Sequence, residues 1–426
     1  MTAPIWTPAS GTSLFTSDQL DTQIVKSCAS ARNIAINSVA SPAFSLTHSQ
    51  VTRHFFHHRP DTVSFFARQV SNSKFVTKAY LRKAGLPAPE GRLFPHDQRK
   101  AAWRYARALG GPVVVKPVTG SYGRGVTADI RAAEHFDTAW QQIPETRSVV
   151  VERHVTGNDY RLLVVGQSFV AAAQRKPASV TGDGVATISE LIDRKNASRS
   201  HNPYASQKSL VLSDMMLYLL ERDGMSPDSV LPEGQVLQLH AVANIGAGGD
   251  SVDVTGQVHP GFMDIALRAA HAIPGMTYAG IDVLAPDITM PPERQAFSIC
   301  EVNTTPDLAL HHFPLVGDSL DAVGTFLEHM FPLARPLPRA QWQRKLAKVS
   351  FASGFEAFRD AIAPFVVQNA CAGRLSRTGE TEAELAIAAP PVASRRFLRQ
   401  VKALRGVKTE LSDWLGEPPD SFEIAG

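Results

Sequence analysis

Apolar and polar positions alternate along the chain in two periods, which predict a protein of mixed helices and strands. Apolar residues that recur every three or four positions are typical of amphipathic helices, and short β-branched runs are typical of buried strands. We expect helices over residues 17–32, 73–81, 97–109, 129–142, 188–196 and 262–273. We expect strands over residues 113–116, 148–155, 159–166, 169–175, 279–284 and 296–303. The 159–166 and 169–175 strands are predicted to form a hairpin about Gly166-Gln167.

The length and composition of the chain indicate two or three domains. It has 426 residues, of which 44% are hydrophobic, enough to bury a sizeable core. We expect a mixed α/β region over 1–70, a main domain over 71–332 with a surface insertion at about 200–238, and a mostly helical extension over 333–426. Helical spacing in the extension predicts helices at 354–362 and 394–405. The second helix is basic, and we expect it to pack on the protein body or at a dimer interface, with an anionic partner as the alternative.

Charge and cysteine usage exclude several classes of protein. The 43 basic and 40 acidic residues give a net charge of +3, too small for a general attraction to nucleic acid or membranes. The three cysteines show neither metal-ligand nor disulfide spacing, and no run approaches the length needed to cross a bilayer. We therefore expect a cytoplasmic protein without nucleic-acid or membrane partners. A cluster of histidines, His54, His57 and His58, lacks carboxylate or cysteine companions, so we favour a non-metal role for it.

A strand that ends in a lysine and runs into a glycine-rich loop is the first candidate for chemistry. The apolar run 113–115 leads to Lys116, and glycines follow at positions 120, 123 and 125. Glycines let backbone N–H groups turn toward an anion, and the lysine adds a positive charge, so the segment could fold over phosphates. The lysine precedes the glycines, which excludes a P-loop and a Rossmann fingerprint. An ordinary hairpin would also explain the segment.

Three oxygen-bearing side chains on two short apolar strands form the second candidate. Asp282 lies between Ile281 and Val283, and Glu301 and Asn303 alternate about Val302, so the latter two point to the same face of their strand. Carboxylate and amide oxygens suit Mg²⁺, which needs few carboxylates when substrate phosphates complete its shell. The alternative is a set of exposed edge acids. It is disfavoured because residues 297–302 are apolar enough to be core, where an unpaired carboxylate is costly.

In this order, the motifs resemble those of the ATP-grasp superfamily, and most closely the ATP-grasp domain of cyanophycin synthetases. The resemblance covers about residues 70–332. It is carried by residues 116–126, 151–153 with 156–161, 175–178, 181–184, 253–255 with 259–260, and 301–303. The chain departs from the family in lacking a Mur-ligase-like domain with its own P-loop. It also has Asp307 in place of a usual glycine and His240 in place of a usual arginine.

The resemblance implies a fold and a role for individual residues. It implies an α+β, ATP-grasp fold in which two α/β subdomains clamp ATP, with the mixed N-terminal region and the helical extension attached. Lys74 and Lys116 would be the paired ATP-phosphate lysines, and Arg175 would face the transferred phosphate. Arg161 would help there or hold a substrate carboxylate. The other implied cofactor contacts are the lid residues Gly120, Ser121, Gly123 and Gly125, the adenine-binding hinge Glu152, Arg153, His154 and Val155, the ribose-binding Asp159, and the magnesium ligands Asp282, Glu301 and Asn303.

The resemblance also implies an activity. An ATP-dependent carboxylate–amine ligase would join two amino acids, or an amino acid and a short peptide or amine, through an acyl-phosphate, using ATP and Mg²⁺ with Mn²⁺ as an alternative ion. A γ-glutamyl or glutathione-type ligase, a chain-extending relative, and a non-catalytic ATP-binding regulatory protein are the alternatives. Relatives of this kind self-associate, so a homodimer or homotetramer is expected.

Overall fold

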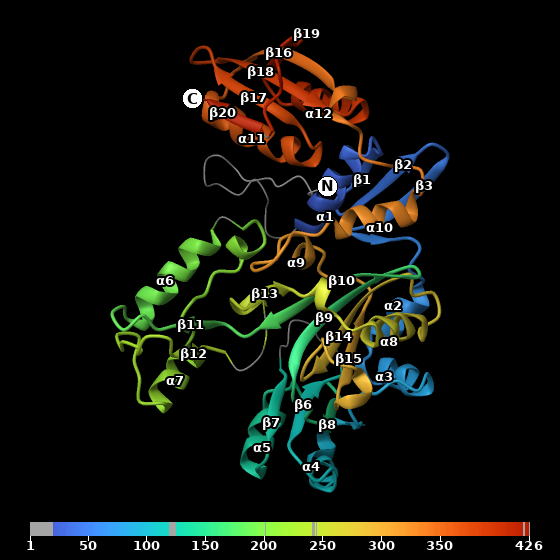
Figure 1. The fold of residues 1–426 in the computed structure, drawn as a ribbon, viewed down its shortest axis with the longest axis vertical. Helices are drawn as coiled ribbons and strands as arrows, with labels where there is room; N and C mark the ends of the chain where they lie inside the picture. The colour runs from blue at the N-terminus through green and yellow to red at the C-terminus, as the bar shows by residue number, and fades with distance from the viewer. Residues whose placement is uncertain are drawn as a thin grey trace. The chain divides into compact units, whose positions relative to one another are not determined.

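The computed structural model describes residues 20–118, 125–200, 202–240, 243, 245–420 and 422–425 (Figure 1). The chain folds into two compact units. The terminal unit comprises Met1–Asp61, Ser200–Gln207 and Ser319–Gly426, and the central unit comprises Thr62–Arg199 and Lys208–Asp318. Within the described ranges, no helix has the length and apolar character needed to cross a membrane.

The central unit is built around a five-stranded antiparallel sheet with the strand order β13-β10-β9-β14-β15. One face is apolar, with Tyr160, Leu162 and Val164 of β9 buried, and helix α8 packs against it. Helices α2 and α3 pack against the edge strand β15. The elements are β9 (Asn158–Val165), β10 (Ser168–Lys176), β13 (Asp250–Asp253), β14 (Tyr278–Ala285), β15 (Ser298–Asn303), α2 (Phe65–Asn72), α3 (Lys74–Lys83) and α8 (Pro260–His271).

A second, four-stranded sheet in the central unit has the order β5-β8-β6-β7. Helices α4 and α5 bury their apolar sides on it, and Trp103, Phe136 and Trp140 form an aromatic cluster whose neighbouring ring centroids lie 5.0 and 5.6 Å apart. The elements are β5 (Gly91–Phe94), β6 (Val113–Pro117), β7 (Thr127–Ile130), β8 (Val149–Arg153), α4 (Arg99–Ala108) and α5 (Ala133–Gln141). This packing fixes the ends of β6 and β8, where Lys116 and Glu152 lie.

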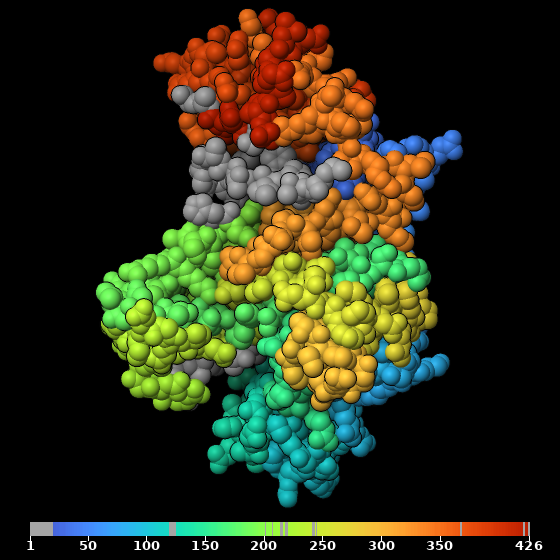
Figure 2. All heavy atoms as spheres, viewed as in Figure 1, coloured from blue at the N-terminus to red at the C-terminus, as the bar shows by residue number. Residues whose placement is uncertain are grey.

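The predicted surface insertion is larger than expected and has a hydrophobic core of its own. It begins at β11 (Ser179–Thr181), which pairs with β12 (Val236–Gln238), and includes α6 (Ile188–Arg199) and α7 (Asp214–Arg222). Ile188, Leu220 and Leu231 are among the residues that pack in this core. Figure 2 shows the segment, in green, as a compact lobe. This core extends beyond the predicted bounds of about 200–238, because α6, although polar in sequence, contributes residues to it.

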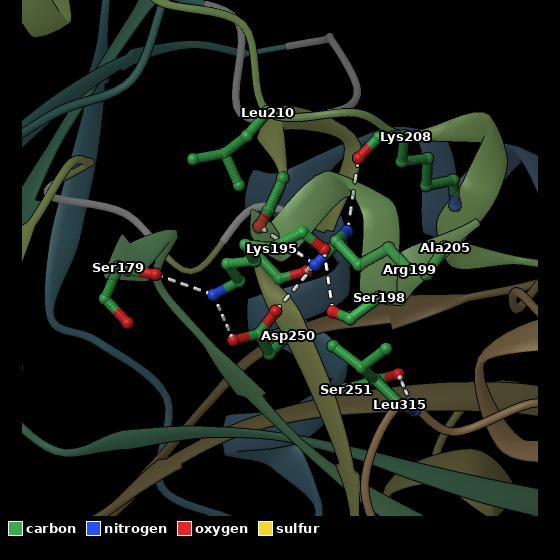
Figure 3. A network of polar contacts seen from close by, with 12 residues as sticks. Ser179, Lys195, Ser198, Arg199, Ala205, Lys208, Leu210, Asp250, Ser251 and Leu315 are labelled. Carbon is green, nitrogen blue, oxygen red and sulfur yellow. Dashed lines mark hydrogen bonds and ion pairs between the residues drawn. The ribbon is translucent and has the colours of Figure 1, made fainter. Parts of the chain in front are cut away.

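Two cations, a half-buried lysine and a fully buried arginine, tie this insertion to strand β13 (Figure 3). Lys195 Nζ lies 2.7 Å from Asp250 Oδ2, and Arg199 Nη1 lies 2.6 Å from Asp250 Oδ1. Arg199 is only 1% exposed and also donates to the carbonyls of Gly248 and Gly249 at 3.3 Å. The glycine-rich loop before β13 is therefore held by the insertion through a charged, desolvated contact.

The N-terminal part of the terminal unit is a four-stranded antiparallel sheet, β1-β2-β3-β4, packed with two helices. Phe44 and Phe55 stack at 5.0 Å, and Phe326 meets Phe55 edge-on at 6.3 Å. Arg32 Nη2 donates to Asp321 Oδ2 at 2.8 Å. The elements are α1 (Leu20–Ala31), β1 (Ala35–Ala40), β2 (Ala43–His48), β3 (Val51–Phe56), β4 (Arg59–Pro60) and α10 (Ala322–Met330).

The C-terminal part of the terminal unit corrects the expectation of a mostly helical extension. Both predicted helices exist, but they cover a five-stranded sheet of order β19-β16-β18-β17-β20. The chain order from β16 to β19 is βαββαβ, as in ferredoxin-like folds. The elements are β16 (Gln343–Phe351), α11 (Phe355–Gln368), β17 (Ala372–Arg377), β18 (Glu382–Ala389), α12 (Pro391–Lys402), β19 (Val407–Asp413) and β20 (Phe422–Ala425). The basic helix α12 buries Phe397 and Val401 in the core of this sheet.

Candidate active site

The face of the large sheet opposite α8 carries the charged residues. Residues two apart on a strand share a face, and residues paired across an antiparallel ladder do as well. Arg161 is paired with Asp282, which is paired in turn with Glu301, and Asp159 is paired with Arg175. Because these pairings connect β10, β9, β14 and β15, the five side chains lie on one face of the sheet.

Two arginines and two aspartates on this face form a compact ion-pair quartet. Arg161 donates to Asp282 through Nε and through Nη2, the latter at 3.2 Å. Arg175 Nη2 lies 2.6 Å from Asp159 Oδ1 and 3.0 Å from Asp282 Oδ2. The quartet is electrically balanced, which is what allows four charges to share a poorly hydrated position.

Burial and the arginines shift the pKa values of the two aspartates in opposite directions. Burial on its own would raise the pKa of Asp282, but Arg161 and Arg175 outweigh it and hold that pKa below the usual range. Burial raises the pKa of Asp159, because a single arginine, Arg175, does not offset the loss of water and the nearby Asp282. Asp282 is thus the more strongly ionised of the two carboxylates.

The three proposed magnesium ligands lie on adjoining strands. Asp282 and Glu301 are directly paired, and Asn303 is paired with Gly280. Lys74 of α3 lies beside this group, with Nζ 3.7 Å from Glu301 Oε1. In the described part of the chain, no three His, Cys, Asp or Glu residues gather as a self-contained metal site. Two carboxylates and an amide nevertheless suit Mg²⁺, which commonly takes one or two protein carboxylates and completes its shell with phosphate oxygens and water.

A buried carboxylate between two lysines forms the other half of the site. Lys78 of α3 and Lys116 of β6 donate to the two carboxylate oxygens of Glu152 on β8. The side chains of Lys78 and Glu152 are each 4% exposed. The helix lysine that shares an anion with Lys116 is therefore Lys78. That Lys74 contacts the ATP phosphates together with Lys116 stays a prediction. Lys78 could have been found, because it lies one turn after Lys74 and three residues before the buried Leu81.

The pKa values of this triad follow from burial and net charge. Burial and the neighbouring Lys116 lower the pKa of Lys78 to about 8. Burial would also lower the pKa of Lys116, but Glu152 raises it above the usual value. Burial would raise the pKa of Glu152, and the two lysines hold it down instead. Two cations for one anion leave a local excess of positive charge, which favours a polyanion.

The predicted hinge follows β8 at the edge of the small sheet. Arg153 donates its backbone N–H to the carbonyl of Glu90 at 2.8 Å, and His154 donates its own to Pro112 at 2.9 Å. His154 Nδ1 accepts the backbone N–H of Asp129 at 3.0 Å. Val155 follows directly, half-buried. These two backbone N–H groups already donate to carbonyls of the protein. The predicted nucleotide contact therefore falls to the backbone carbonyls of the hinge and to Val155.

Most of the predicted lid lies outside the described residues, namely Gly120, Ser121 and Gly123. Gly125 is described and has a φ of +72°, a conformation that disfavours other residues. A Cβ atom at this position would also lie 3.3 Å from Pro117 Cδ. Gly125, which precedes strand β7, therefore lies close to the end of β6, which carries Lys116.

Curated relatives match this chain over most of its length. The cyanophycin synthetase of Synechocystis sp. is 37% identical over 275 residues, which cover 63% of this chain and 31% of that protein. A glutathione biosynthesis bifunctional protein of Mannheimia succiniciproducens is 32% identical over 277 residues, covering 63% and 36%. The solved structure of a bifunctional glutathione synthetase from Pasteurella multocida matches with a TM-score of 0.54 and 27% identity, covering 72% of this chain and 43% of that one.

The chain contains an ATP-grasp domain. This confirms the α+β, ATP-grasp fold predicted from the sequence. The chain spans about a third of the length of the curated relatives that it matches. No family model matches it. Within the ATP-grasp domain, the lysine–glutamate triad lies between α3 and the small sheet, and the arginine–aspartate quartet lies on the large sheet.

Proposed function

We propose that this protein is an ATP-dependent carboxylate–amine ligase that forms an amide bond between two amino acids, or between an amino acid and a short peptide or amine. The observation that carries the proposal is the pairing of two charged clusters within one ATP-grasp domain. One cluster has an excess of buried positive charge, and the other offers guanidinium groups beside two carboxylates. The likeness to cyanophycin synthetase and to glutathione biosynthesis proteins supports amide-bond chemistry.

Lys78 and Lys116 would neutralise the ATP phosphates. Phosphoryl transfer depends mainly on positioning and on stabilising charge, which two buried ammonium groups supply. Glu152 keeps both lysines ionised and in place before the nucleotide arrives. We assign the helix position of the lysine pair to Lys78, and we place Lys74 with Glu301 at the edge of the metal group. The hinge residues 152–155 and the lid residues 120–125 would enclose the base and the phosphates.

The arginine–aspartate quartet would receive the carboxylate. An oxygen of the substrate carboxylate attacks the γ-phosphorus of ATP, ADP leaves, and an acyl-phosphate forms. Arg175 and Arg161 would orient the attacking carboxylate and offset the charge that develops. Mg²⁺, held by Asp282, Glu301 and Asn303, would supply charge neutralisation at the phosphates. Asp159 contacts Arg175 directly, so we assign it to positioning this arginine, a contact with which any ribose hydroxyl would compete.

The second step joins the amine. The neutral amine attacks the acyl carbon, loses a proton, and displaces inorganic phosphate. Acyl-phosphates hydrolyse, so the site must exclude water while the amine binds. The predicted lid, residues 120–125, would supply this exclusion.

ADP and phosphate release with Mg-ATP, measured across pairs of amino acids and simple amines, tests the proposal. Release that requires both partners, with a condensed product in the mass spectrum, is the expected result. Nucleotide binding without release for any pair would favour a non-catalytic ATP-binding protein. A glutathione-type ligase, suggested by the second group of relatives, would join a side-chain carboxylate. A chain-extending enzyme would give a ladder of products instead of one.

Location and assembly form part of the same proposal. We propose a cytoplasmic, homo-oligomeric enzyme, a dimer or tetramer, whose partners are small amino-acid or peptide substrates. Its three cysteines, Cys28, Cys300 and Cys371, are free thiols, which fits a reducing compartment. Size-exclusion chromatography with light scattering would measure the assembly, and a monomer at micromolar concentration would contradict it.

A further inference from the structure

A buried histidine beside the arginine–aspartate quartet has no role in the function proposed above. His311 lies in the short helix α9 (Ala309–His312) and is 2% exposed. Neither of its ring nitrogens has a hydrogen-bond partner among the residues that the structure describes. An imidazole buried in this way loses its hydrogen bonds to water without replacing them, a cost that an apolar side chain would avoid.

The position of α9 places this imidazole next to the quartet. Helix α9 packs against β10, the strand that carries Arg175. The turn that precedes α9 lies against Gly280, where an added Cβ would come within 2.8 Å of Pro306 Cβ and 3.0 Å of Arg161 Cδ. Close approach of this turn to Arg161 therefore depends on the missing side chain at Gly280. The turn and helix bring His311 to the strands that bear both arginines.

The charges that face His311 keep its ring neutral. Burial lowers its pKa to about 3, and Arg161 and Arg175 act in the same direction, whereas Asp307 opposes them. A neutral imidazole offers one N–H donor and one acceptor nitrogen. At the pH of a cell, His311 is thus a hydrogen-bonding group rather than a charged partner of the quartet.

We propose that His311 is a substrate-binding residue, whose ring N–H donates to the carboxylate that Arg161 and Arg175 orient. The inference rests on the proposed ligase function and extends it to the acyl-donor pocket. An oxyanion at this position would satisfy the buried donor and accept from two guanidinium groups at once. A neutral donor adds selectivity there, because it recognises the anion without adding a third positive charge to a site that must also admit Mg²⁺.

Substitution His311→Phe tests this assignment, since phenylalanine keeps the ring and removes both nitrogens. With the substrate pair found for the wild type, KM for the carboxylate substrate is expected to rise roughly ten- to a hundredfold, the effect of one lost hydrogen bond to a charged group. KM for ATP is expected to stay within about threefold, and the unfolding temperature to stay level or rise. An unchanged KM for the carboxylate substrate would overturn the proposal.

The neighbouring histidine offers a matched control. His312 lies on the same helix and is also buried, and its ring meets Phe313 edge-on at 4.7 Å. His312→Phe should leave KM for the carboxylate substrate within about threefold. An equal rise of this KM in both variants would indicate a general disturbance of α9 and would overturn the specific role of His311.

A spectroscopic measurement covers the case in which the phenylalanine variant does not fold. In wild-type protein labelled with ¹⁵N-histidine, the His311 ring resonances should shift when the carboxylate substrate is added with Mg-ADP. If the wild type releases no ADP with any pair, the ligase function fails independently, and inorganic phosphate becomes the anion probe for His311. A shift of the ring resonances supports the binding role, and unchanged resonances under both conditions overturn it.

Discussion

Removing the charge of Glu152 should destabilise the ATP-grasp domain, and bound ATP should restore part of the lost stability. In Glu152→Gln the side chain keeps its size, but Lys78 and Lys116, whose side chains are 4% and 8% exposed, lose their shared anion. Breaking a buried ion pair by removing one partner costs about 3–5 kcal/mol. The cost has a ceiling, because a lysine can instead give up its proton. Starting from its usual pKa of 10.5, that costs about 5 kcal/mol at pH 7.

Thermal unfolding, with and without Mg-ATP, measures this effect. At about 2–4 °C per kcal/mol for a domain of this size class, the apo variant should unfold roughly 6–20 °C below the wild type. Glu90→Gln is the matched control, because Glu90 pairs with Arg153 at the surface and such pairs contribute about 0–1 kcal/mol. Mg-ATP should narrow the gap for Glu152→Gln, since its phosphates replace the missing anion. Equal unfolding temperatures for the two variants, or a gap that ATP leaves unchanged, would refute the reasoning.

Four other outcomes are expected. Lys78→Ala should weaken ATP binding about 10- to 100-fold, whereas Lys74→Ala should change it less than threefold. Calorimetric titration of each variant with ATP measures the difference, and a larger loss of affinity in Lys74→Ala would favour Lys74 as the phosphate-binding lysine. Because Lys78 loses its proton near pH 8, ATP affinity should fall above that pH, and Lys78→Arg should move the fall to higher pH. Glu301→Ala should nearly abolish turnover at any Mg²⁺ concentration, and substantial activity would remove Glu301 from the metal group. Arg199→Ala should lower stability by about 3–5 kcal/mol, against about 0–1 kcal/mol for the exposed Arg194→Ala, as chemical denaturation would report.

Local patterns predicted most of the central unit. The hairpin about Gly166-Gln167 is present as β9 and β10, and the acid-bearing strands are present as β14 and β15. In each case the information is short-range, because a two-residue alternation specifies both the strand and the face that each side chain takes. The same alternation placed Glu301 and Asn303 together on one face.

The C-terminal sheet could not be predicted from local sequence patterns. Strand β16 has neighbours on both sides, and Val349 pairs with Ala383 on one side and with Thr409 on the other. These partners lie far along the sequence, and the strand carries two lysines and an arginine, so its own composition is typical of a solvated segment. Long-range pairing decided the structure where local propensity did not.

The candidate site shows the same limit. Lys74 and Lys78 lie one turn apart on α3, and helical spacing alone does not tell which of them reaches the small sheet. The contact of Asp159 with Arg175 depends on the register of β9 against β10. Among the described residues the His311 ring has no hydrogen-bond partner, which depends on how α9 packs on β10. The sequence shows which residue types are present, but which side chains contact each other depends on the folded structure.

The proposed function depends on one step, the activation of a carboxylate by phosphorylation in this ATP-grasp domain. The most direct measurement uses the carboxylate substrate labelled with ¹⁸O, incubated with Mg-ATP and the amine partner, and follows the label into the products by mass spectrometry. Acyl-phosphate formation predicts that each phosphate released carries one labelled oxygen and that each amide keeps the other. Amide formation with unlabelled phosphate would contradict the account.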